Sequence, residues 1–154
     1  LRLNTDTQQH AYVLNSGEMS PPEELVSAFN SGLKLQDIFT DQFKVGRTGN
    51  DILKRAREQA IKQDLKQTIY THPIGYHGHA AGTTLGMWDS QQGVVGSGEY
   101  PLHANTAYSI ELNNAYFLKM WDKEIRIMLE EEAFFDGNSV RYIDGRQTTL
   151  HIIK

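Results

Sequence analysis

The first part of the chain carries apolar residues at the spacing of two amphipathic helices. The first helix is expected to begin at Ser20-Pro21-Pro22-Glu23, because serine is a favoured N-cap, proline suits the first turn and a glutamate follows three residues on. Within this helix, Ser31-Gly32 predicts a kink or break. A second helix is expected from the N-cap signal Thr48-Gly-Asn-Asp51 to about Gln63. The apolar positions of the two faces are Leu25, Val26, Phe29, Leu33, Ile38, Phe39, Ile52, Leu53, Ala56 and Ala60.

After Lys66 the pattern changes to short apolar or alternating segments separated by turn residues, which is typical of strands. Asp136-Gly137 predicts a hairpin turn between the last two segments. Another strand is expected near the start of the chain, in Ala11-Tyr-Val-Leu14. Two helices followed by an antiparallel sheet predict an α+β fold. The segments expected as strands after Lys66 are 68–71, 107–112, 116–118, 125–135 and 140–143.

Imidazole and carboxylate side chains gather in this strand-rich part. Three of the six histidines, His72, His77 and His79, fall within eight residues. Glu111 stands alone between apolar residues, and Glu130-Glu131-Glu132 interrupts an apolar segment. Imidazole and carboxylate groups are the ligands of many divalent-metal sites. The sequence therefore indicates a metal site built on strands.

The carboxylate triplet is the sharpest of these signals. Strand alternation places Glu130 and Glu132 on one face and Glu131 on the other, so at least one carboxylate faces inward if both faces are covered. An inward carboxylate needs a cation, which Arg126 or a metal ion would supply. Taken alone, the triplet could instead be a solvated charge run, and Glu111 could face solvent from an edge strand.

Composition narrows the classes of function. The chain has 154 residues, the length of one domain, and a net charge of −4 with no basic block, which argues against nucleic-acid or membrane-surface binding. No apolar run approaches the roughly 20 residues of a membrane span. The absence of cysteine excludes disulfides and thiolate ligands. The chain opens at Leu1 in the middle of a pattern, so we expect a fragment of a longer polypeptide, and its compartment stays open.

Five segments, in order, resemble motifs of the pita-bread metallopeptidases, the family of methionine aminopeptidases, Xaa-Pro aminopeptidases, prolidases and creatinases. Gly78-His79-Ala-Ala-Gly82 resembles the family's Gly-His-x-x-Gly, and Tyr108-Ser-Ile-Glu111-Leu112 resembles its Phe-Thr-Ile-Glu-Pro strand. The triplet strand from Arg126 is similar to Arg-Ile-Glu-Asp-Asp with two extra residues. Asn4-Thr-Asp6-Thr-Gln is similar to the strand of the second metal-bridging aspartate, and 46–53 to the helix entry. The likeness is greatest to the Xaa-Pro aminopeptidases.

The resemblance implies a fold and a ligand set. The fold would be an α+β pita-bread fold, a curved antiparallel sheet flanked by helices, incomplete at its N-terminus, with 1–154 as one partial catalytic domain. The metal ligands would be Asp6, His79, Glu111 and Glu130, with a first aspartate expected upstream of Leu1. They would hold two divalent ions, Mn, Co, Fe or Zn, that activate a water molecule.

Other roles at this site are also implied by the resemblance. Glu111 would act as general base, and His72 or His77 would hydrogen-bond the substrate. His77 remains an alternative ligand to His79, as Glu131 does to Glu130. Trp88 stands where the family often has a further histidine, which puts ordinary proline-specific activity in doubt, and Leu112-Asn113 replaces Pro-Gly.

The function expected from this resemblance is a dinuclear aminopeptidase that hydrolyses an N-terminal peptide bond, plausibly before proline. A creatinase-like, metal-independent C–N hydrolase or lyase is the alternative on the same fold. A third reading is a catalytically inactive domain used for binding. The expected partner is a peptide substrate, without nucleic acid or membrane, and a homodimer is left open.

Overall fold

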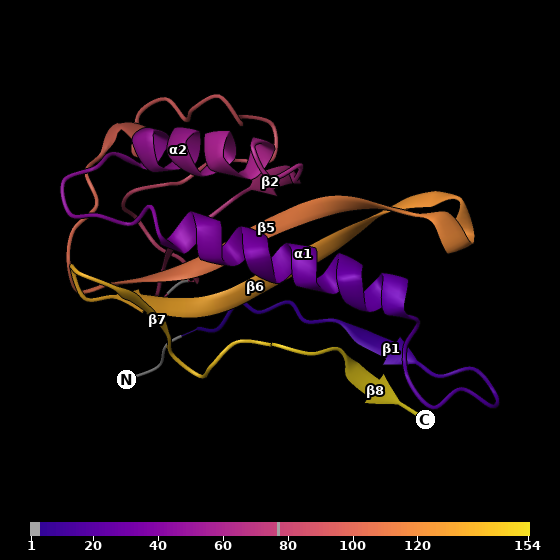
Figure 1. Ribbon diagram of the computed structural model, residues 1–154. Helices are drawn as coiled ribbons and strands as arrows, with labels where there is room; N and C mark the ends of the chain where they lie inside the picture. The colour runs from indigo at the N-terminus through magenta and orange to yellow at the C-terminus, as the bar shows by residue number, and fades with distance from the viewer. Residues whose placement is uncertain (1–3, 77) are drawn as a thin grey trace.

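The computed structural model describes residues 4–76 and 78–154, which form two helices packed on a curved antiparallel sheet (Figure 1). The helices are α1, Glu23–Thr40, and α2, Gly49–Ile61, with short 3-10 turns η1, Ser97–Glu99, and η2, Lys119–Trp121. This arrangement confirms the predicted α+β class. The strands are β1 Ala11–Val13, β2 Lys66–Ile69, β3 His72–Gly75, β4 Gly78–His79, β5 Thr106–Leu118, β6 Lys123–Phe135, β7 Val140–Tyr142 and β8 His151–Ile153.

A long ribbon of two strands, β5 and β6, forms the centre of the sheet. The strand order is β4-β3-β5-β6-β7, and β2 pairs with β5 beyond the end of β3. The N-terminal segment adds to the other edge of β6, where Gln8 bridges to Glu130. It then continues into β1, which pairs in parallel with β8 near the C-terminus. Residues from both ends of the chain therefore lie beside the central ribbon.

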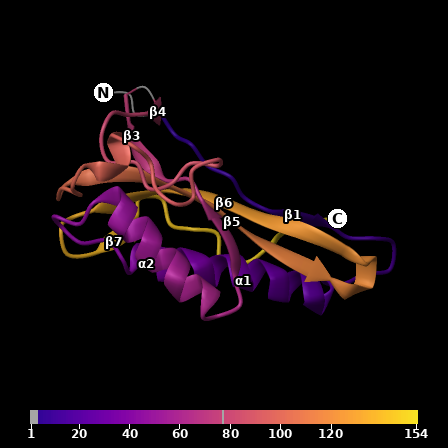
Figure 2. The ribbon, with the colours of Figure 1, turned by 90° about the horizontal axis from the view of Figure 1, so that it is seen from above.

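Both helices cover the same side of the sheet, as Figure 2 shows. The core fills the space between the helices and the sheet. In it, Phe29, Leu35 and Phe39 of α1 are fully buried together with Ile110 and Leu129 of the ribbon. None of the helices in residues 4–76 and 78–154 is long and apolar enough to cross a membrane.

Of the kink or break predicted at Ser31-Gly32, the break is wrong, since α1 continues through both residues. The glycine serves close packing instead: a Cβ atom at Gly32 would lie 2.7 Å from Cγ2 of Ile127 and 3.1 Å from Cδ1 of Leu129. The helix therefore approaches the sheet more closely than any side chain at this position would allow.

The second helix begins as predicted, with the Thr48 hydroxyl accepting a hydrogen bond from the Asp51 amide at 3.1 Å. The strands differ from the prediction in several places: β3, β4 and β8 were not predicted, and the expected segment 68–71 overlaps β2 only at residues 68–69. A further difference concerns β5. Segments 107–112 and 116–118 form one continuous strand, β5, because Asn113 and Asn114 between them pair with Met128 and Ile127 of β6. Pairing in the sheet here overrides the low strand preference of asparagine.

Candidate metal centre

The two faces of the β5–β6 ribbon differ in chemistry. The register pairs Glu111 with Glu130 and Ser109 with Glu132. Because opposite residues of antiparallel strands share a face, these side chains lie together, and we call this side the acid face. The next residues along each strand point the other way, towards α1, on what we call the helix face. The helix face carries the apolar residues Ile110, Leu112, Leu129 and Ala133, together with Tyr108 and Glu131, all buried.

The structure thus places Glu130 and Glu132 on one face and Glu131 on the other, as the alternation predicted. Glu131 is occupied elsewhere: its carboxylate accepts a hydrogen bond from the Gln147 amide at 2.9 Å and lies 3.3 Å from Nε2 of Gln9. Of the two glutamates between which the sequence could not choose, Glu130 is therefore the one beside Glu111.

The N-terminal segment brings Asp6 to the acid face. The Asp6 amide donates to Oε1 of Glu132, and the Asp6 carbonyl lies 3.2 Å from the Ser109 hydroxyl. That hydroxyl also lies 2.7 Å from Oε1 of Glu130, so Ser109 links the segment to the ribbon. A residue more than 100 positions away in the chain thus joins the two strand glutamates.

His72 lies at the centre of this group. It pairs with Ser109 in the sheet, its side chain is 5% exposed, and its Nε2 lies 3.9 Å from both Oδ2 of Asp6 and Oε2 of Glu111. Its Nδ1 is 3.1 Å from the Pro73 carbonyl, which can only accept, so Nδ1 carries the proton. In the neutral ring Nε2 then holds a lone pair, and this buried atom has no hydrogen-bond partner among the described residues. A cation placed between this lone pair and the two carboxylates would contact all three groups.

His79 stacks on His72 at the mouth of the site. The ring centroids are 3.9 Å apart, and Nε2 of His79 lies 3.5 Å from Oδ2 of Asp6. The His79 side chain is 58% exposed, and its Nδ1 is 3.3 Å from the hydroxyl of Tyr70. The remaining candidate of the histidine segment, His77, lies outside the described residues.

Within residues 4–76 and 78–154, two groups of side chains could hold a metal ion, with ligand atoms within 4.8 Å of one another in each. One consists of Asp6, His72 and His79, and the other of His72, Glu111 and Glu130, so His72 belongs to both. Among the residues that the structure describes, no lysine or arginine forms an ion pair with these carboxylates. The described lysines and arginines therefore do not compensate the negative charge of the acid face.

The electrostatics of the site reflect this excess of negative charge. Burial, followed by the neighbouring Glu130 and Asp6 carboxylates, raises the pKa of Glu111 to about 8. Burial also raises the pKa of Glu130, against the opposing hydrogen bond from Ser109. Burial lowers the pKa of His72, which keeps its ring neutral and its Nε2 lone pair available. Carboxylates that hold protons and an imidazole that resists one suit a site whose cation is a metal.

The sequence did not point to Tyr70 and Ser109, which hold other site residues by hydrogen bonds. Ser109 stands two positions before Glu111, and strand alternation alone places both on one face. Tyr70 stands two positions before His72, and its ring contacts those of His72 and His79. Trp88 lies behind it, with its ring centroid 5.9 Å from that of Tyr70.

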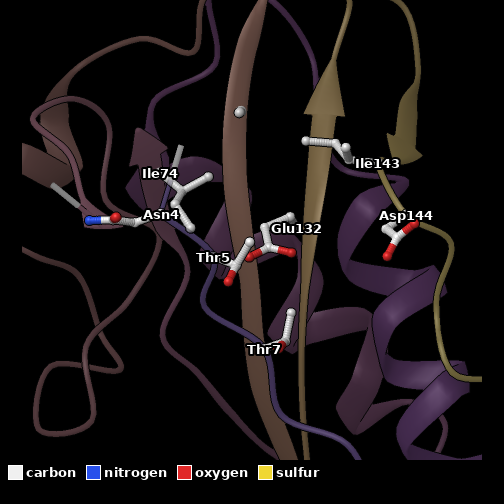
Figure 3. Close-up of a pocket in the computed structure, with 8 residues that line it drawn as sticks. Asn4, Thr5, Thr7, Ile74, Glu132, Ile143 and Asp144 are labelled. Atoms are coloured by element: carbon white, nitrogen blue, oxygen red, sulfur yellow. The ribbon is translucent and has the colours of Figure 1, made fainter. Parts of the chain in front are cut away.

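A cavity of about 480 Å³ adjoins the acid face through Glu132. Figure 3 shows Glu132 in the middle of the residues around it, with Asn4 and Ile74 on one side and Ile143 and Asp144 on the other. Its volume is in the range of small-molecule sites. The lining residues are Asn4, Thr5, Thr7, Ile74, Ala107, Glu132, Ile143 and Asp144.

No protein-family model matches the chain, and no curated protein sequence is similar to it. Solved structures, in contrast, resemble it over almost its whole length. An X-Pro aminopeptidase from Thermotoga maritima has a TM-score of 0.69 at 17% identity, over 98% of this chain and 38% of that one. A prolidase from Thermococcus sibiricus has a TM-score of 0.65 at 12% identity, over 98% and 36%. An Xaa-Pro dipeptidase from Bacillus anthracis has a TM-score of 0.62 at 17% identity, over 98% and 38%.

The chain thus spans less than two-fifths of the length of these peptidases. Identities this low establish the fold and leave the activity to chemical argument. The fold implied by the sequence motifs is confirmed, and the chain has the pita-bread fold that it shares with aminopeptidases and prolidases.

Proposed function

We propose that the chain is part of the catalytic domain of a metal-dependent aminopeptidase that binds two divalent cations on the acid face. The observation that carries the proposal is the unpartnered Nε2 of His72, which is buried between the carboxylates of Asp6 and Glu111. A neutral imidazole lone pair among carboxylates is a donor set for Mn, Co, Fe or Zn.

The ligands that we propose are Asp6, His72, Glu111 and Glu130. His72 takes the place that the motif comparison gave to His79, for two reasons. It belongs to both groups of potential ligands, and its Nδ1 proton leaves Nε2 free to coordinate. His72-Pro-Ile-Gly75 also has the His-x-x-Gly spacing of the family motif, as 79–82 does. The first aspartate of a dinuclear site remains an expectation for sequence upstream of Leu1.

Cations bound here would lower the pKa of a water molecule and polarise the scissile carbonyl. Glu111 is the side chain that would accept the proton of that water, because burial and two neighbouring carboxylates already raise the proton affinity of Glu111. His79, exposed beside Asp6, would hydrogen-bond the substrate carbonyl. If His72 is the ligand, His79 is the further histidine that the family often has downstream of the ligand. Trp88 then does not replace that histidine. His77 remains a candidate for a substrate contact.

For the substrate we propose a peptide cleaved after its first residue, with proline as the second. Its support is the structural likeness to an X-Pro aminopeptidase and an Xaa-Pro dipeptidase. The cavity beside Glu132 offers room for a substrate side chain. The creatinase-like and binding-domain alternatives need no cation, and neither accounts for the buried, unpartnered Nε2 of His72.

Titration of the chain with Mn²⁺ and Zn²⁺ in a calorimeter tests the proposal. His72→Ala should lose binding by a factor of about 100 or more, because it removes a ligand shared by both groups. His79→Ala should retain most of the affinity. The matched control is His103→Ala, an exposed histidine outside both groups, which should bind as the wild type does.

Hydrolysis of Xaa-Pro peptides by the metal-loaded protein is the second readout. Glu111→Gln should abolish turnover while the circular dichroism spectrum stays that of the wild type. Absence of cation binding by the wild type, or peptidase activity that survives this substitution, contradicts the proposal.

A further inference from the structure

His72 and His79 are stacked, yet their ring nitrogens face different partners. In His72, Nδ1 faces a carbonyl that can only accept, so the proton stays on Nδ1. In His79, Nε2 faces the carboxylate of Asp6 at 3.5 Å, and Nδ1 faces the hydroxyl of Tyr70 at 3.3 Å. A carboxylate can only accept as well, so the proton of a neutral His79 ring belongs on Nε2. The same rule therefore assigns opposite tautomers to the two rings.

We infer that the Tyr70 hydroxyl fixes His79 in the Nε2–H tautomer by donating its own proton to Nδ1. A phenol can donate or accept, so it can complete either tautomer of the ring. Asp6 on the far side of the ring removes this freedom, because it accepts from Nε2–H and repels a lone pair there. Tyr70 then has one role left, that of donor.

Tyr70 is held in place by three contacts of its backbone and ring. The backbone of Tyr70 donates to the Glu111 carbonyl at 3.0 Å, which ties it to β5. Its ring contacts His72 at 5.5 Å and Trp88 at 5.9 Å between centroids. These contacts leave the hydroxyl directed at His79, which is the more exposed of the two histidines and therefore the one in need of support.

His72 and His79 therefore have different roles in the site. His72 offers a lone pair, which a metal ion needs, whereas His79 offers a proton, which a substrate oxygen needs. Tyr70 is then a positioning residue that acts through His79. The catalytic side of this inference depends on the proposed hydrolase function, but the tautomer of His79 does not.

The test measures the tautomer directly. In the ¹⁵N-histidine-labelled chain without added metal, at about pH 8 where ordinary histidines are neutral, two-bond ¹H–¹⁵N correlation spectra report which ring nitrogen carries the proton. The rings are assigned with His72→Ala and His79→Ala. We expect Nε2–H for His79 and Nδ1–H for His72. A predominant Nδ1–H form of His79 in the wild type overturns the inference.

Tyr70→Phe removes the hydroxyl and keeps the ring contacts. Loss of one hydrogen bond should shift the tautomer ratio of His79 about fivefold towards Nδ1–H, while His72 stays unchanged. The matched control is Tyr12→Phe, which removes a hydroxyl that donates to Glu18 at 2.9 Å away from the site and should leave both ratios as they were. An unchanged His79 ratio in Tyr70→Phe also overturns the inference.

Turnover gives the functional half of the test. If the chain is a peptidase, Tyr70→Phe should lower kcat about tenfold with little change in KM or in Mn²⁺ affinity, since the donor is misoriented and no ligand is lost. A loss of Mn²⁺ affinity instead would make Tyr70 a support of the metal ligands and overturn its role through His79. If no variant and no wild-type sample turns over peptide, the proposed function fails, and the tautomer measurement still decides the inference.

Discussion

The helix face and the acid face are made by alternate residues of the same two strands, yet burial has opposite effects on the stability of the two faces. Ile110 and Leu129 bury apolar side chains under α1, where each contributes favourable burial. Glu111 and Glu130, their direct neighbours in sequence, crowd negative charge on the other side, where burial is unfavourable. Apolar burial on the helix face stabilises the ribbon. The acid face can therefore carry charged groups whose burial is unfavourable.

This division has a physical basis in the period of the strand. A shift of the β5–β6 register by one residue would exchange the two faces and place Glu111 against α1. The apolar set on the helix face therefore fixes the register, and the register in turn sets Glu111 opposite Glu130. Stability on one side specifies geometry on the other.

The largest expected loss of stability is caused by a substitution on the helix face. Leu129→Ala should destabilise the fold by about 3 kcal/mol, because Leu129 is fully buried and truncation leaves a cavity under α1. Glu130→Gln, one residue away on the acid face, should cost little stability without added metal, since it removes a repelled charge. Urea denaturation of both variants measures the contrast, and equal losses would contradict the division between the faces.

A second change tests how closely α1 approaches the helix face. Gly32→Val should destabilise by about 2 kcal/mol, because its side chain would overlap Ile127 and Leu129. The matched control is Lys34→Val, at an exposed position of the same helix, where only helix propensity changes and the loss should be a few tenths of a kcal/mol. If both variants lose the same stability, the close approach has no energetic importance.

Local patterns predicted the second helix and the two faces, but they placed the N-cap of the first helix at Ser20, whereas α1 begins at Glu23 after Pro22. The N-cap at Thr48 and the alternation of residues 130–132 depend only on neighbours in sequence, and both are observed. Gly32 shows the limit of such reasoning. A glycine within a helical pattern signals either a break or a close contact, and only the partner strand, about 95 residues away, decides between them.

The site shows the same limit among its histidines. His72 and His79 each begin a His-x-x-Gly segment, so spacing cannot tell which one coordinates a metal. The difference arises from long-range pairing: His72 lies on β3 opposite Ser109 and is buried, whereas His79 lies on the outer strand β4 and is exposed. Tyr70 was missed because its role depends on a side-chain contact that no motif encodes.

On the acid face, a substitution of Ser109 should have a smaller effect, on metal affinity. Ser109→Ala removes the hydrogen bond to Glu130 and should weaken Mn²⁺ binding about tenfold, because an unsupported ligand carboxylate is less well oriented. Ser109→Thr retains the hydroxyl and should restore most of the affinity. Calorimetric titration checks both variants, and a loss of affinity that threonine does not restore would point to packing instead of orientation.

The smallest expected effect is the pH dependence of stability without added metal. Between about pH 6.5 and 8 most folded molecules hold a proton on Glu111, whose pKa is raised to about 8, while the unfolded chain has already released that proton near the ordinary value of 4.5. The folded state binds more protons in this range, so stability falls as the pH rises, by roughly 1 to 2 kcal/mol between pH 6.5 and 8. Glu130 acts in the same direction, since its pKa is also raised.

His10 and His72, whose pKa values burial lowers, act in the opposite direction and below this range. There the unfolded chain binds more protons, so their contribution to stability is lost as the pH falls below about 6.5. Glu111→Gln should therefore flatten the decline above pH 6.5 and steepen the decline below it, because the proton that folded Glu111 binds between pH 4.5 and 6.5 opposes the effect of the histidines. Thermal unfolding at a series of pH values measures both declines. A decline above about pH 6.5 that persists in Glu111→Gln would mean that Glu111 is not the group that holds the additional proton in the folded state.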